Sequence, residues 1–163
     1  MSRFTHLDQE GHVRMVDVTA KQPTARHAVA QGIVHMQPDT LALIYNQKVK
    51  KGNVLETARI AGIMSAKKTA DLIPMCHPLN ITHVQVDFFP DTAASSIRIE
   101  AAVRIVDQTG VEMEALTAVV VSALTIYDMC KSYDRNMTIS EICLLEKSGG
   151  KSGTYQRADQ GHP

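Results

Sequence analysis

Asp128 and Lys131, near the end of a long apolar stretch, have side chains suited to proton transfer. They are three positions apart, which places them on one face of a helix, about one turn from each other. The ordinary explanation is a surface ion pair. The two residues could also act on a substrate, because a carboxylate accepts a proton and a lysine stabilises phosphate or a developing anion. The apolar run 119–126 before them favours burial, and burial shifts pKa values.

Two glutamates stand at the start of the same predicted helix. Glu112 is expected to complete a capping box with Thr109, and Glu114 to interact favourably with the helix dipole. Glu114 and Asp128 are fourteen residues apart, which puts them on nearly the same face but about 21 Å apart along the axis. A small substrate cannot touch both in one chain. If both line a site, helices of two subunits must run antiparallel, so this spacing predicts a homo-oligomer with its site at a two-fold interface.

The segment LIPMCHPL (72–79) is predicted to be irregular, because two prolines bracket Met75, Cys76 and His77. Such a loop presents fixed backbone donors and one titratable ring, although a simple connector with His77 in solvent is the alternative. A zinc site is disfavoured, since adjacent ligands are uncommon and no second Cys/His pair has ligand spacing. No metal site is predicted, and the remaining histidines are interpreted as incidental: His6, His12, His27, His35, His83 and His162.

Lysines cluster locally although the formal net charge is zero. The clusters are Lys50 with Lys51, Lys67 with Lys68, and Lys147 with Lys151 in a glycine-rich segment. Each is explained most simply as a soluble surface. The GGKSG stretch lacks the spacing of a phosphate-binding P-loop, which argues against a P-loop NTPase. A lysine-bearing tail that folds over an anionic ligand remains open.

Composition excludes several function classes. Aromatic residues make up only 4% and tryptophan is absent, which argues against a stacking platform for nucleic acid. Balanced charge gives no field that would attract DNA or an anionic membrane. The longest apolar stretch, 115–126, is too short to span a bilayer, and the polar N-terminus does not resemble a signal peptide. Three cysteines without CxxC spacing favour a reducing compartment, and we expect the cytoplasm.

Hydrophobic periodicity predicts an α+β fold in a single domain, 1–163, with an extended arm (1–23) and a flexible tail (148–163). Strands are expected at 28–36, 84–88, 97–105 and 137–145, and helices at 40–47 and 109–133. A further helix is expected to begin at a capping box formed by Asn53 and Glu56 and to end before Pro74. The order strand, helices, strand, strand, helix, strand is that of a ferredoxin-like split βαβ sandwich. In this fold an antiparallel sheet has its helices packed on one face.

Several longer segments closely resemble the cyclic pyranopterin monophosphate synthase family of molybdenum cofactor (molybdopterin) biosynthesis. The strongest matches are DLIPMCHPL (71–79), TGVEMEALT (109–117), ALTIYDMCK (123–131) and KSGGKSG (147–153), with shorter ones at 15–19, 51–52, 57–63 and 66–69. The resemblance spans almost the whole chain. Asn53 stands where the family often has Asp, and both residues cap a helix well.

The resemblance implies a lyase that converts a cyclised GTP intermediate into cyclic pyranopterin monophosphate with release of pyrophosphate. It also implies a ferredoxin-like fold and a hexamer, built as a trimer of dimers, with sites at subunit interfaces. No cofactor is expected, other than Mg²⁺ accompanying the substrate phosphates, and neither nucleic acid nor membrane is an expected partner.

The resemblance also implies roles for particular residues. The catalytic residues are Lys51, Asp128 and Lys131. Those that hold substrate, or lie close to it, are Met75, Cys76, His77, Glu112, Met113 and Glu114, with Lys147 and Arg26 as further cations for the phosphates. Our hypothesis is that Asp128 is the base and Lys131 the acid, although the two roles could be exchanged.

Two other functions fit part of these observations. A nucleotide-sensing regulatory module of ferredoxin-like fold would need cationic loops but no paired carboxylate and lysine at an interface. A metal-dependent phosphohydrolase would need closely spaced Asp and His residues, and this sequence lacks that spacing.

Overall fold

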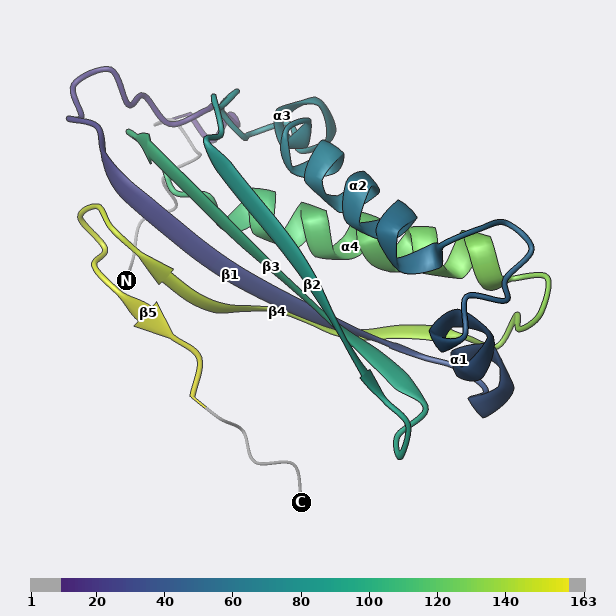
Figure 1. The fold of residues 1–163 in the computed structure, drawn as a ribbon. Helices are drawn as coiled ribbons and strands as arrows, with labels where there is room; N and C mark the ends of the chain where they lie inside the picture. Colours follow the sequence, from purple (N-terminus) through teal and green to yellow (C-terminus); the bar gives the residue numbers. More distant parts are fainter. Residues whose placement is uncertain (1–9, 159–163) are drawn as a thin grey trace.

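A long antiparallel sheet with its helices on one face forms the body of the protein (Figure 1). The computed structural model describes residues 10–158. The elements in chain order are β1 (Thr24–His35), α1 (Pro38–Tyr45), α2 (Val54–Ala66), α3 (Thr69–Leu72), β2 (His83–Asp91), β3 (Ser96–Asp107), α4 (Glu112–Cys130), β4 (Thr138–Ser148) and β5 (Tyr155–Gln156).

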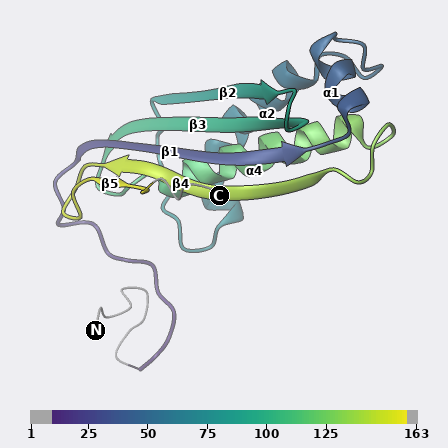
Figure 2. The same cartoon turned by 90° about the horizontal axis from the view of Figure 1, so that it is seen from below.

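The sheet has the order β2-β3-β1-β4-β5, and every neighbouring pair is antiparallel. Because β1 lies between β3 and β4, each strand-helix-strand unit is split by a strand from the other half of the fold. The predicted ferredoxin-like α+β class is therefore confirmed. Seen from below, the sheet covers α2 and α4, and no helix of residues 10–158 lies on its other face (Figure 2).

The core lies between the sheet and the two long helices. Alternate residues of β3 are buried on this side, as the period-two pattern predicts: Ile97, Ile99, Ala101, Val103 and Ile105. They face apolar residues of α4, among them Ala115, Val119 and Ile126, each fully buried. By length and composition α4 could cross a membrane, but 56% of its 18-residue apolar window is buried inside the protein, where it forms part of the core.

Small residues let α2 and α4 approach closely. Gly62 of α2 faces Ala118 and Ser122 of α4, and the Ser122 hydroxyl donates a hydrogen bond of 3.0 Å to the carbonyl oxygen of Ala58. A side chain at position 62 would separate the helices. This contact fixes α2, and the loop before it, relative to α4.

The first predicted capping box forms in part. Asn53 is the N-cap of α2 and its Oδ1 accepts a hydrogen bond from the Glu56 amide at 3.1 Å. The Glu56 carboxylate turns instead to Arg59, with Nε and Oε1 3.3 Å apart. An ion pair one helical turn away therefore replaces the predicted return bond to the Asn53 amide.

The second predicted capping box is wrong. α4 begins at Glu112 after Val111, and no described side chain caps it. The Glu112 carboxylate lies 2.9 Å from Lys147 Nζ. It therefore forms an ion pair with a residue distant in the sequence, and not the predicted bond to the Thr109 amide.

Several element boundaries differ from those expected. β1 begins at Thr24 and β4 continues to Ser148, because cross-strand pairing extends each beyond its apolar run. Of the predicted arm, the described part (10–23) contains no helix and no multi-residue strand. Of the predicted tail, the part from 149 to 158 turns back and adds β5 to the edge of β4. Residues 1–9 and 159–163 lie outside the described residues.

Candidate active site

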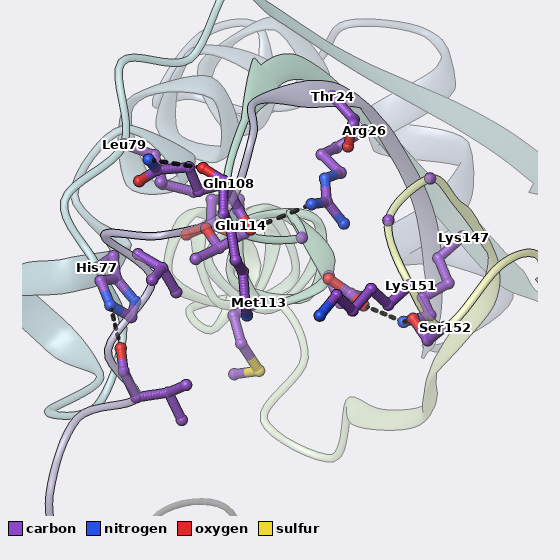
Figure 3. Close-up of a pocket in the computed structure, with 18 of the residues that line it drawn as sticks. Thr24, Arg26, His77, Leu79, Gln108, Met113, Glu114, Lys147, Lys151 and Ser152 are labelled. Carbon is purple, nitrogen blue, oxygen red and sulfur yellow. Dashed lines mark hydrogen bonds and ion pairs between the residues drawn. The ribbon is translucent and has the colours of Figure 1, made fainter.

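A pocket of about 910 Å³ opens at the end of the sheet where α4 begins (Figure 3). Its walls come from segments far apart in the sequence: the arm (16–22), the start of β1, the 75–79 segment, the 108–110 loop with the first turn of α4, and the turn after β4 (147–152). The pocket brings together all the residues predicted to hold substrate or lie near it: Arg26, Met75, Cys76, His77, Glu112, Met113, Glu114 and Lys147.

Arg26 projects into this pocket from β1 and is held by backbone oxygens (Figure 3). Its Nε donates to the Asp107 carbonyl at 3.2 Å, and Nη2 donates to that of Gln108 at 3.1 Å. Gly150 passes directly over Nη1, so closely that a Cβ there would overlap the guanidinium. The φ of +74° at Gly150 also favours glycine. The guanidinium is therefore positioned before any ligand binds.

Three lysines from two sides of the pocket add positive charge: Lys21 of the arm, and Lys147 and Lys151 of the turn after β4. Lys147 Nζ lies 2.9 Å from Glu112 Oε1 and donates to Ser152 Oγ at 2.7 Å. Glu112 thus offsets part of the charge, and the pocket keeps a net positive wall suited to phosphate groups.

Glu114 and Cys76 form a less polar end of the pocket. Glu114 is only 3% exposed, and burial, opposed by a hydrogen bond from its own backbone amide and aided by the nearby charge of Glu112, raises its pKa to about 7. Burial also raises the pKa of the Cys76 thiol, with a smaller contribution from Glu114. A carboxyl with a pKa near neutrality can both give and accept a proton.

The arm is joined to the pocket at two points. A His77 ring nitrogen, Nε2, lies 2.9 Å from the carbonyl oxygen of Val16, as the dashed line in Figure 3 marks. Gln108 Nε2 donates to the Lys21 carbonyl at 3.0 Å. Because a carbonyl only accepts, Nε2 of His77 carries a proton, and a neutral ring leaves Nδ1 as an acceptor.

The three residues predicted to be catalytic lie together elsewhere, at the other end of α4. Lys131 Nζ is 2.7 Å from Asp128 Oδ1. Lys51, in the loop before α2, reaches the same residue, with Nζ 2.8 Å from the Asp128 carbonyl oxygen and 3.4 Å from Oδ2. One carboxylate is therefore shared by two lysines.

Pairing rather than burial controls the charge of this cluster. Hydrogen bonds from Lys131 and Lys51 lower the pKa of Asp128, and the bond to Asp128 raises that of Lys131. The expectation of burial is not met, because the side chains of Asp128 and Lys131 are 59% and 54% exposed. At neutral pH Asp128 is a carboxylate and Lys131 an ammonium.

The pocket and the lysine cluster occupy opposite ends of one helix. Glu114 lies in the first turn of α4 and Asp128 in the last, about 21 Å apart at the rise of an α-helix. In Figure 1 the first end lies beside the arm and β5, and the other beside α1. A single chain therefore holds two separate groups of candidate residues.

Comparison with known proteins identifies the family of this chain. The MoaC family matches residues 15–150. The chain belongs to the MoaC family. A cyclic pyranopterin monophosphate synthase of Desulforapulum autotrophicum is 64% identical over 163 residues, which cover 100% of both chains. Proteins of the same name from Desulfatibacillum aliphaticivorans and Chloroflexus aurantiacus are 65% and 60% identical, over 95% and 96% of this chain and 98% and 96% of their own.

Sequence reasoning missed some residues of this MoaC pocket. Gln108 and the arm residues carry no chemical signature in the sequence, since the arm offers the backbone carbonyl oxygens of Val16 and Lys21, and the Gln108 amide meets the second of these only in the fold. His27, interpreted as incidental, also lines the pocket, and its Nδ1 lies 3.2 Å from Glu146 Oε1. Between residues 10 and 158, no three His, Cys, Asp or Glu side chains are grouped as a metal site would require.

Proposed function

We propose that this protein is a cyclic pyranopterin monophosphate synthase, which converts a cyclised GTP intermediate into cyclic pyranopterin monophosphate and pyrophosphate in molybdenum cofactor biosynthesis. The observation that carries the proposal is the division of the expected residues of a MoaC chain into a cationic pocket and a lysine-carboxylate cluster. These are the two components that the reaction needs: a holder for a triphosphate and groups that move protons.

In the pocket, the phosphates would bind Arg26, Lys147, Lys151 and Lys21. Charge-assisted hydrogen bonds to phosphate are short and strong, and the Arg26 guanidinium, held in place by the Asp107 and Gln108 carbonyls, would contribute its remaining N–H groups to them. The pterin-forming part of the substrate would then lie towards Glu114 and His77, whose polar atoms can hydrogen-bond its ring nitrogens. Mg²⁺, if required, would be carried by the phosphates.

In the cluster, Lys131 would be the acid and Asp128 the base. The raised pKa of Lys131 and the lowered pKa of Asp128 keep the first an ammonium and the second a carboxylate at neutral pH, which are the charge states that an acid and a base must have before they react. Lys51 would stabilise negative charge that develops as rings open and close. We expect the reaction to be lost when any of these three groups is removed.

We further propose that each complete site needs two copies of the chain. Antiparallel α4 helices across a two-fold axis would bring the pocket of one copy to the cluster of the other. Exposed apolar side chains on the outer helical surface support such a contact: Met113 and Leu124 on α4, and Ile60 and Met64 on α2. Three such dimers would form the hexamer implied by the family. The three free cysteines fit the cytoplasm.

The reaction is tested by giving the purified protein the cyclised GTP intermediate and measuring pyrophosphate and pterin product together. Joint release of both, lost in Lys131→Ala, is the expected result. If a folded, oligomeric wild-type protein released neither, the regulatory module would be favoured. If a chelator abolished activity and zinc or manganese restored it, a metal-dependent phosphohydrolase would be favoured.

The shared site is tested by mixing two inactive variants, Lys131→Ala in the cluster and Lys147→Ala in the pocket. In a mixed dimer both defects fall in one site and the other site is intact. Random reassociation should therefore restore about a quarter of wild-type activity. If the mixture stays inactive although subunits exchange, each chain carries its own complete site.

A further inference from the structure

A second, smaller cavity lies behind the main pocket. It has a volume of about 90 Å³ and shares three residues with the pocket: His77, Leu79 and Glu114. Its other walls come from the end of α2, from α3, and from Pro78 and Ile81. Since a water occupies about 30 Å³ in the liquid, this cavity has room for about three waters.

Glu114 stands between the two cavities. It lines both, and only 3% of its surface is exposed. The buried hydroxyl of Thr69, in the rear cavity, donates to the Ala66 carbonyl at 3.0 Å, which leaves its lone pairs able to accept from water. The rear cavity is thus polar enough to hold ordered water next to Glu114.

The rear cavity also reaches the surface. Lys67, Lys68 and Asp71 form part of its wall, and all three are exposed. A substrate in the main pocket would cover the front of Glu114 but none of these residues. The rear side would then be the remaining route between this carboxyl and solvent.

We propose that Glu114 is a further catalytic proton-transfer group, and that the rear cavity connects it to solvent while substrate fills the main pocket. This proposal rests on the proposed function. The carboxylic acid donates its proton to a substrate heteroatom and becomes a carboxylate. That carboxylate then takes a proton from a hydronium ion in the rear cavity, so that one proton passes from solvent to substrate, and the reverse sequence removes one. A pKa raised to about 7 by burial suits both directions.

Other charged or titratable groups line the same two cavities and would influence this transfer. Glu112 precedes Glu114 on α4, and the others are Lys21, Arg26, His27, Cys76, His77, Lys147 and Lys151 around the front pocket, and Lys67, Lys68 and Asp71 around the rear cavity. His77 lines both cavities, whereas Lys67, Lys68 and Asp71 line only the rear one, so the rear route can be blocked at residues that do not touch the phosphate-binding wall.

The test uses Ala70, which lines only the rear cavity and is half-buried. Ala70→Leu fills the cavity, and Ala70→Ser is the matched control that keeps it open and polar. Rapid-mixing infrared spectroscopy would follow hydrogen-deuterium exchange of the Glu114 carboxylic acid, identified by the loss of its band in Glu114→Gln. Exchange is measured with and without bound cyclic pyranopterin monophosphate, and binding of that product is titrated separately.

In wild type and Ala70→Ser, product should leave the exchange rate nearly unchanged. In Ala70→Leu, exchange should be normal without product and about tenfold slower with it, and kcat should fall by about tenfold at unchanged KM. The proposal would be overturned if product slowed exchange in wild type as much as in Ala70→Leu. It would also be overturned if Ala70→Leu and Ala70→Ser had the same exchange rates and the same kcat. A wild-type protein that binds no product and has no activity would instead refute the proposed function.

Discussion

Replacing Gly62 by alanine should destabilise the contact between α2 and α4. A Cβ at this position would overlap Ser122 Oγ and would lie 3.0 Å from the Ala118 carbonyl oxygen and 3.3 Å from Val86 Cγ2. Ser122 is fully buried and its hydroxyl is bonded to the Ala58 carbonyl at 3.0 Å. The new methyl group therefore has no free space to enter.

Two opposing effects decide the size of the change. Alanine is favoured over glycine inside a helix by about 1 kcal/mol. Against this, rotating Ser122 away from Ala58 leaves a buried hydroxyl unpaired at a cost of about 1–3 kcal/mol, and separating the helices costs a similar amount. We expect a net loss of about 1–5 kcal/mol in the free energy of unfolding, and a Tm lower by roughly 2–4 °C for each kcal/mol lost in a chain of this size.

Urea and thermal denaturation at one fixed protein concentration would measure this loss. Ser122→Ala provides the control background, because it removes the overlapping atom together with its hydrogen-bonding requirement. In that background Gly62→Ala should cost at least about 1 kcal/mol less than in wild type. Strictly additive effects, or a stabilised Gly62→Ala protein, would refute the packing argument and leave helix propensity as the dominant effect.

Two further predictions concern the pocket. The Glu114 carboxyl has a pKa of about 7 in the folded protein and an ordinary value of 4.5 in the unfolded chain. Between these two pH values the folded protein holds a proton that the unfolded chain has lost. The free energy of unfolding of wild type should therefore fall as pH rises from about 4.5 through 7, by about 3 kcal/mol in total relative to Glu114→Gln. Urea denaturation at a series of pH values would measure both proteins, and an equal pH dependence of the two would contradict this prediction. Gly150→Ala should displace the Arg26 guanidinium and raise KM by about tenfold or more, whereas Gly153→Ala, also at positive φ but in open space, should leave KM unchanged in steady-state assays.

Local patterns predicted the elements that build the sheet and its helical layer. The alternation along β3 and the Asn53 cap depend on neighbours within a few residues, so they could be read from the sequence. Glu112 shows the limit of such reasoning. Its spacing from Thr109 fits a capping box, but the fold brings Lys147 beside it, and that partner lies 35 positions away in the chain.

The candidate site was predictable in its residue types but not in its arrangement. Family motifs indicated the pocket residues and the lysine cluster, and helix geometry placed Glu114 and Asp128 far apart. The sequence could not indicate that Asp128 is shared by two lysines, or that Gly150 covers Arg26. Both arrangements depend on loops that lie far from their partners in the sequence and reach them only in the folded chain.

The interval between Glu114 and Asp128 limits how this chain can change length. Fourteen residues are close to four full turns, so both side chains leave α4 in nearly the same direction. One inserted residue would rotate Asp128 by about 100° relative to Glu114, and two such errors would accumulate across a symmetric pair of helices. Insertions and deletions should therefore be rare inside α4 during evolution.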